Sequence, residues 1–200
     1  SIRFIVTPES MAIDEARRSL TDLSLFQLSS DAVIMNRILP KEALHEPFFQ
    51  EWGRAQEERL GEVREIFEPM ACLIGPLQPD EVRGVEALAD HGERLFGALD
   101  PISTLGKSIG LRFERDEAGA RVRWPLRGLD PETLDVLRVD DELVVGVRGR
   151  RRKLVLPAGF SKLEVETVAM WGEELVVTFA SAEPVPGLTE GVVLRKGASS

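Results

Sequence analysis

The chain has 200 residues, of which 43% are hydrophobic and 30% are charged, and its formal net charge is −9. These values are ordinary for a globular protein of one or two domains, and the acidic balance argues against general nucleic-acid binding, which needs a basic surface. The single cysteine, Cys72, excludes an internal disulfide, and the two histidines, His45 and His91, have no ligand-spaced partner, so we predict no metal site.

The first half of the chain alternates apolar strands with amphipathic helices. Apolar runs predict strands at residues 2–6, 32–36 and 71–75. Apolar residues three and four positions apart predict helices from Pro8 to about residue 28, from Pro47 to about residue 67, and at 81–96. This alternation predicts right-handed βαβ units on a parallel sheet, and because three strands are few for such a sheet, we expect part of a larger one.

Polar or proline-containing segments follow each of these strands, where parallel sheets bind their ligands. They are residues 7–9, the pair Asn36 and Arg37, and residues 75–80. The side chain of Asn36 carries a carbonyl and an amide group that can pair with the donor and acceptor edge of a purine. Alternatively, Asn36 only caps a loop and Arg37 is solvated, and spacing leaves both interpretations open.

The second half is strand-like. Six alternating segments occur in about 80 residues, LRFERD, ARVRWPL, TLDVLRVD, ELVVGVRG, RKLVLPAG and ELVVTFA, and turn signals separate them. They predict an antiparallel β-sandwich. The basic run at residues 148–153 could bind nucleic acid, but we favour an exposed hairpin whose charges discourage edge-to-edge pairing.

A change of composition predicts a domain boundary near residue 100. Residues 1–99 carry 10 Lys/Arg and 18 Asp/Glu, whereas residues 100–200 carry 15 and 16. We predict domains at 1–99 and 108–182, a linker at 100–107 and a tail at 183–200. The residues Gly106, Lys107 and Ser108 match the last three positions of the phosphate-binding P-loop motif G-x-x-x-x-G-K-[ST]. The first glycine of that motif would fall at Pro101, which has no N–H to donate to a phosphate.

Three segments of the first half together resemble the ArsA-type anion-transporting ATPases: FIVTPESMAIDEARRSL, AVIMNRILP and GPLQPDEVRGVEAL. The segments GLDPETLDVLRVDDELVVGVRGRRRKLVLPAGF and GEELVVTF resemble the α-crystallin (small heat-shock) sandwich that some bacterial members carry. The resemblance spans nearly all of the chain. It implies the C-terminal part of a parallel P-loop NTPase-type sheet with helices, followed by an α-crystallin-like sandwich.

The resemblance also implies an ATP site on four residues of this chain. Asn36 would bind adenine, Pro76 and Leu77 would contact the base, and Glu9 would lie at the nucleotide. The family's P-loop, catalytic aspartate and magnesium-binding switches lie upstream of the matching segment. We therefore expect ATP and magnesium as cofactors, magnesium ligands in an N-terminal half, and neither catalytic residues nor metal ligands in these 200 residues.

The function that follows is the adenine-binding side of an ATPase for anion transport or membrane-protein targeting, inactive alone. Expected partners are the N-terminal half of the same ATPase, a second copy in a homodimer, and a membrane protein or hydrophobic client, but no nucleic acid. The chain opens inside a strand with no leader, so we expect a piece of a longer cytoplasmic protein. The alternative is a non-enzymatic small heat-shock-like chaperone or interaction module, and an upstream G-K-G-G-x-G-K-[ST] would decide between them.

Overall fold

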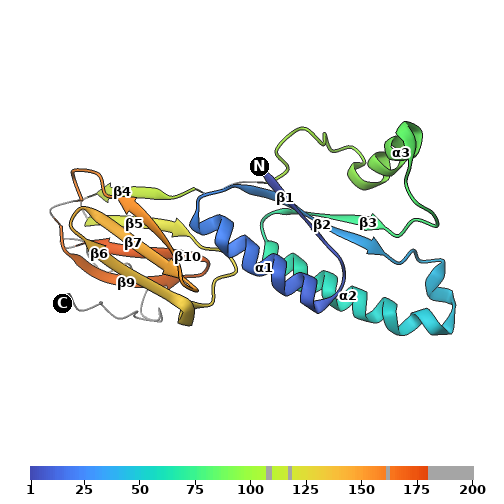
Figure 1. Ribbon diagram of the computed structural model, residues 1–200, viewed down its shortest axis with the longest axis horizontal. Helices are drawn as coiled ribbons and strands as arrows, with labels where there is room; N and C mark the ends of the chain where they lie inside the picture. Colours follow the sequence, from blue (N-terminus) through green and yellow to red (C-terminus); the bar gives the residue numbers. More distant parts are fainter. Residues whose placement is uncertain (107–109, 117–118, 161–162, 180–200) are drawn as a thin grey trace. The chain divides into compact units, whose positions relative to one another are not determined.

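The computed structural model describes residues 1–106, 110–116, 119–160 and 163–179 (Figure 1). These residues form two compact units. The first unit holds residues 1–20 and 29–106, and the second holds residues 21–28 together with the described residues from 110 onward. The tail predicted at 183–200 and the last residue of the linker predicted at 100–107 lie outside the described residues, and the domain borders stay a prediction.

The first unit contains a parallel sheet in the order β1-β2-β3, as the alternation of strands and helices predicted. The strands are β1 (Ile2–Val6), β2 (Ser30–Ile38) and β3 (Ala71–Pro76), and the helices are α1 (Ser10–Leu25), α2 (Pro47–Phe67) and α3 (Gly84–Phe96). A short 3₁₀ helix, η1 (Ala43–His45), precedes α2. No helix among the described residues is both long and apolar enough to cross a membrane.

The helix ends differ from the predicted ones in three places. Helix α1 begins at Ser10, two residues after the predicted start, and the Thr7 hydroxyl before it donates to the Glu9 carboxylate. The same helix ends at Leu25, and Gln27 adopts a φ of 60°, which a helix cannot continue through. Helix α3 begins at Gly84, later than residue 81.

Helices α1 and α2 cover one face of this sheet (Figure 1). The two crossovers step in the same direction along the sheet, and right-handed crossovers of that kind place both helices on the same side. On that face the rings of Phe4 and Phe67 meet edge to face, with centroids 5.2 Å apart. Strand alternation points Arg3 to the opposite face, where its guanidinium lies 5.8 Å from the Phe96 ring centroid. Helix α3 therefore lies on the opposite side.

Arg3 and Asp31 hold the segment after α3 against the amino end of the sheet. The Asp31 side chain is 1% exposed and accepts hydrogen bonds from Arg3 at 3.2 and 3.1 Å. Arg3 also donates to the carbonyls of Pro101 and Ser103, both at 2.7 Å, and the Leu105 N–H donates to Asp31 at 2.9 Å. Most of the predicted linker is thus anchored to the first unit.

The second unit contains two antiparallel sheets with the orders β4-β5-β10-β9 and β6-β7-β8, as predicted. The strands are β4 (Arg112–Asp116), β5 (Gly119–Pro125), β6 (Leu134–Val139), β7 (Glu142–Val147), β8 (Arg150–Val155), β9 (Val165–Trp171) and β10 (Glu174–Phe179). The six predicted segments did not include β9. Its buried residues, Val168 and Ala169, are adjacent, so the strand lacks the alternation that would have predicted it.

The core of the second unit includes a residue from far upstream. Leu25 is fully buried among the inward-facing side chains of both sheets, which include Trp124, Leu143 and Phe179. The Trp124 indole N–H donates to the Ser24 carbonyl at 3.2 Å. Residues 21–28 therefore contribute to the hydrophobic core of this unit, which the change of composition near residue 100 did not indicate.

The basic run occupies the turn before β8 and the strand itself, which is an edge strand of the described β6-β7-β8 sheet. Arg150 pairs with Asp22 at 3.3 Å, Arg151 with Asp135 at 3.3 Å, and Lys153 with Glu142 at 2.7 Å. Gly146 lies between Arg151 and Asp135 on the middle strand, β7. A Cβ atom on Gly146 would lie 3.0 Å from an Asp135 oxygen, so the absence of a side chain there lets Arg151 reach Asp135. Much of the basic charge is thus neutralised within the unit.

The Asp31 carboxylate should make stability depend on pH. Burial raises the pKa of Asp31, but hydrogen bonds from Arg3 and the Leu105 amide outweigh this effect and leave the pKa below its ordinary value. The stabilisation is therefore complete above about pH 4, the pKa of an unfolded aspartate, and is lost as pH falls through the lower folded pKa.

Asp31→Asn should lower the free energy of unfolding at neutral pH by roughly 1–3 kcal/mol. Urea denaturation at neutral and acid pH checks this, with half-exposed Asp14→Asn as the control, and equal stability of Asp31→Asn and wild type at neutral pH would contradict it.

Leu25→Ala should destabilise the second unit. The substitution leaves a cavity in a closed core, which typically costs about 2–5 kcal/mol. Urea unfolding followed by the fluorescence of the buried Trp124 measures the loss. Leu28→Ala is the matched control, because Leu28 is 51% exposed. If the two variants lose the same small amount, residues 21–28 do not belong to this core.

Candidate functional site

The candidate site lies at the carboxyl edge of the parallel sheet. Val6 pairs with Met35, and Met35 pairs with Ile74, so the three strands reach this edge together. The segments that follow them carry the residues predicted to bind a nucleotide. The observed register thus confirms that the three segments leave the same edge of one sheet, while their role in binding stays a prediction.

A β-bulge at the end of β2 contains Asn36. Met35 pairs with Ile74, but the next pair is Ile38 with Pro76, so Asn36 and Arg37 together face the single residue Gly75. Arg37 has a φ of 61°, a left-handed conformation that is uncommon for a residue other than glycine. Bulges re-aim side chains and are frequent beside binding sites. The apolar run predicted a strand over residues 32–36, and no feature of the sequence indicates the bulge.

The bulge places the Asn36 side chain directly over Gly75. A Cβ atom on Gly75 would lie 2.9 Å from the Asn36 Oδ1 atom, so only glycine leaves room for this side chain position. Within the part of the chain that the structure describes, the Asn36 amide makes no hydrogen bond and is half-buried. A polar group in this state retains its full capacity to bind a ligand. The loop-capping alternative for Asn36 finds no hydrogen bond to support it.

Pro76 and Leu77 lie beside the bulge. The Leu77 N–H donates to the Ile38 carbonyl at 2.7 Å, which continues the pairing of β2 and β3 past the last residue of β3. The Leu77 side chain is 37% exposed, and Pro76 is half-buried. An apolar pair next to an unpartnered amide can contact the face and the edge of a flat heteroaromatic ring.

Glu9 lies at the end of the neighbouring strand. It directly precedes α1, and its carbonyl accepts the Ile13 N–H at 3.1 Å. Its carboxylate is exposed and accepts from the Thr7 hydroxyl. None of the described hydrogen bonds joins Glu9 to the other three predicted site residues. Glu9 therefore flanks the edge, whereas Asn36, Pro76 and Leu77 lie together.

Gln56 is a residue of this edge that sequence reasoning missed. Its side chain is 8% exposed, and its Oε1 atom accepts the Leu39 N–H at 2.9 Å, just after the bulge. The signal was present, because Gln56 lies on the helical stripe that also carries Val63 and Phe67. A glutamine on a buried stripe requires a hydrogen-bonding partner.

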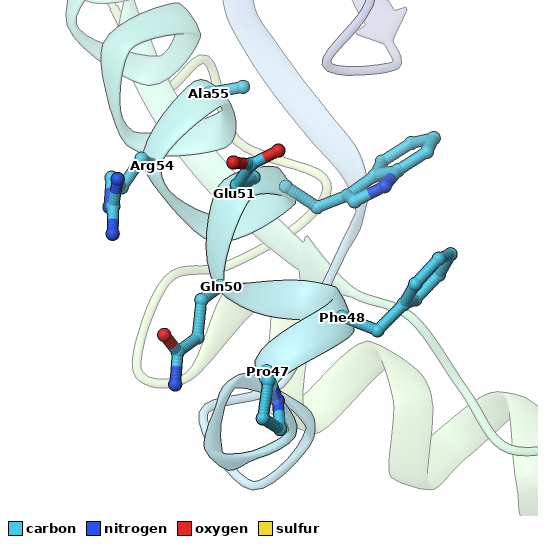
Figure 2. A pocket seen from close by; sticks show the side chains of 7 residues that line it. Pro47, Phe48, Gln50, Glu51, Arg54 and Ala55 are labelled. Carbon is cyan, nitrogen blue, oxygen red and sulfur yellow. The ribbon is translucent and has the colours of Figure 1, made fainter.

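The first turns of α2 carry a shallow hollow away from these residues. Figure 2 shows it with Phe48 pointing to one side of the helix and Gln50 and Arg54 to the other. The lining residues all come from this helix: Pro47, Phe48, Gln50, Glu51, Trp52, Arg54 and Ala55. Trp52 lies four residues before Gln56 on the same helical stripe, but it is 58% exposed.

Neither Cys72 nor a metal cluster offers an alternative site among the described residues. Burial raises the pKa of the Cys72 thiol, which keeps it protonated and a poor nucleophile. Among the described residues, no group of three or more His, Cys, Asp or Glu side chains is placed to hold a metal ion. The carboxyl edge of the sheet is accordingly the best candidate site in the described part of the chain.

Two protein-family models match the chain. Residues 1–97 match the model described as anion-transporting ATPase, and residues 117–179 match the HSP20-like domain found in ArsA. The two matches correspond to the parallel sheet with its helices and to most of the antiparallel sheets.

Curated relatives match both parts. "Putative arsenical pump-driving ATPase 1" of Aquifex aeolicus is 27% identical over 180 residues, which cover 88% of this chain and 46% of the relative. "Putative arsenical pump-driving ATPase" of Chlorobaculum tepidum is 27% identical over 164 residues, covering 82% of this chain and 40% of the relative. The protein of the same name from Halobacterium salinarum is 39% identical over 97 residues, covering 48% of this chain and 15% of the relative.

The chain thus spans less than half the length of these relatives. The matches run in the same order along the chain as the three segments and the sandwich that carried the resemblance in the sequence. The resemblance to the ArsA-type anion-transporting ATPase family is thus confirmed for residues 1–97, and residues 117–179 form the HSP20-like domain found in ArsA.

Proposed function

We propose that this chain supplies the adenine-binding wall of an ATP site in an ArsA-type ATPase. The protein would use ATP to drive anion transport or membrane-protein targeting. The parallel sheet would be the C-terminal part of a P-loop NTPase-type sheet that a further segment completes. The observation that carries the proposal is the half-buried side-chain amide of Asn36, which the bulge sets beside Pro76 and Leu77 and which has no hydrogen-bonding partner among the described residues.

The side chains present fit a purine base. The Asn36 carbonyl would accept from the exocyclic amine of adenine while its amide group donates to a ring nitrogen. Pro76 and Leu77 would pack on the face of the ring. Glu9, at the end of the next strand, would lie toward the ribose or phosphates, where it has room because its side chain is exposed.

The phosphates would be held elsewhere. A P-loop with bound magnesium supplies the positioning and charge neutralisation that phosphoryl transfer needs. The 200 residues contain no G-K-G-G-x-G-K-[ST] sequence, and the P-loop-like residue Gly106 packs on the Asp31 backbone, where a Cβ would lie 2.6 Å from the carbonyl oxygen. This chain would therefore contribute base recognition, with magnesium ligands and the phosphate-binding loop in a partner segment. The HSP20-like unit would provide contacts for a client or partner.

The 200-residue chain alone should not hydrolyse ATP. The 200 residues lack the phosphate-binding loop that would hold the β- and γ-phosphates in the transition state. Phosphate release measured with magnesium and ATP should equal the background of buffer alone. A turnover that co-purifies with the chain through successive columns and is abolished by Asn36→Ala would contradict this expectation.

Asn36→Ala should weaken nucleotide binding in a base-dependent way. In a form of the protein that joins this chain to the proposed phosphate-binding segment, the lost hydrogen bonds should cost roughly 1–3 kcal/mol, about five- to 150-fold in ATP affinity. Inosine triphosphate is already mismatched at the exocyclic position, so its affinity should fall less. Calorimetric titration of both nucleotides against wild type and variant measures the two losses.

The matched control is Gln50→Ala, an exposed polar side chain of α2 outside the edge. It should change neither affinity. A loop-capping role for Asn36 makes a different prediction, in which both nucleotides weaken equally and the melting temperature falls. That outcome would overturn the assignment of Asn36 to adenine.

A further inference from the structure

The bulge that presents Asn36 requires support from outside the sheet. Where two residues face one, regular ladder hydrogen bonds are interrupted, and the bulged strand is free to bend. Arg37 also occupies a left-handed conformation with a φ of 61°, which is unfavourable for a residue other than glycine and persists only where the surroundings hold it in place. The position of the Asn36 amide therefore depends on contacts that fix the chain on both sides of the bulge.

On one side, the sheet provides the support. Met35 pairs with Ile74 before the bulge, and after it the Ile38 carbonyl accepts the Leu77 N–H at 2.7 Å. Beyond Ile38 the strand has ended, and the next backbone N–H, that of Leu39, has no strand partner. Gln56 accepts this N–H through its side-chain Oε1 at 2.9 Å, across 17 residues of sequence.

Gln56 can do this because α2 is itself fixed close to the segment after β2. Its side chain is 8% exposed, which limits it to few rotamers. Three residues earlier, a Cβ on Gly53 would lie 2.7 Å from a Leu44 methyl carbon, so the glycine permits a close approach of the helix to η1. The residues on the turns that follow, Val63 and Phe67, are buried against the sheet. The Gln56 carbonyl is thus a fixed acceptor on a rigid element.

We infer that Gln56 is a positioning residue for base recognition, which rests on the proposed adenine site. By holding the Leu39 N–H, it fixes the register of the bulge and with it the direction of the Asn36 amide. Gln56 does not contact the nucleotide. Its removal should leave the fold intact but let the bulge sample other conformations, in which Asn36 no longer faces the base.

Three variants separate this role from general packing. Gln56→Met keeps the length and most of the volume of the side chain but removes the acceptor. Gln56→Glu keeps an acceptor oxygen at the same position and should restore the wild-type behaviour. Gln50→Met makes the same chemical change on the exposed side of the same helix (Figure 2) and serves as the matched control.

The first measurement is amide hydrogen exchange by NMR in the 200-residue chain. In Gln56→Met, the Leu39 N–H should exchange about five- to tenfold faster, which corresponds to the loss of one hydrogen bond. The Leu77 N–H should also exchange faster, while the exchange rates of the amides in the β1–β2 ladder should stay at their wild-type values. Gln56→Glu and Gln50→Met should match wild type. Unchanged exchange at Leu39 in Gln56→Met would overturn the inference without any reference to nucleotide.

The second measurement is the ratio of ATP to inosine triphosphate affinity, in the same joined form of the protein used for Asn36→Ala. Gln56→Met should lower this ratio toward the value for Asn36→Ala, and Gln56→Glu should retain the wild-type ratio. If Leu39 exchanges faster but the ratio stays at the wild-type value, Gln56 has only a structural role and the inference is wrong. If Asn36→Ala itself leaves the ratio unchanged, the proposed adenine site fails, and the exchange result then stands as a property of the loop alone.

Discussion

The candidate site depends on the mismatch of one residue between β2 and β3. Asn36 and Arg37 together face Gly75, so β2 ends in a bulge. The bulge changes the direction in which the Asn36 side chain leaves the strand. The absence of a side chain at Gly75 leaves the space that Asn36 occupies. The half-buried side-chain amide of Asn36 makes no hydrogen bond to the described residues, which leaves it available to a ligand.

The two units show how distant parts of a sequence share one local structure. Arg3 and Asp31, from the first two strands, hold residues 101–105, and Leu25 enters the core of the antiparallel sheets. Neither contact follows from the composition of the segments involved. Each is nonetheless consistent with elementary rules, because a buried carboxylate requires donors and a buried indole N–H requires an acceptor.

The parallel and antiparallel sheets were predictable from the sequence, because strand and helix periods differ and each half of the chain keeps one pattern. The placement of Asn36, Pro76 and Leu77 at one sheet edge followed from the same pattern, since parallel strands end together. The bulge and the role of Gln56 were not predicted, because both depend on register and side-chain contacts across many residues. The exposure of Trp52 was not predictable for a related reason: the spacing that puts Trp52 on the stripe of Gln56, Val63 and Phe67 does not indicate where along α2 the buried part of that stripe begins.

Intermolecular NMR contacts would show whether the carboxyl edge of this sheet binds adenine. With ATP bound to isotope-labelled protein, we expect nuclear Overhauser effects from the adenine ring protons to the Leu77 methyl groups, the Pro76 ring and the Asn36 side-chain amide. Contacts from the adenine protons to other residues only, under conditions where ATP is bound, would contradict adenine binding at this edge.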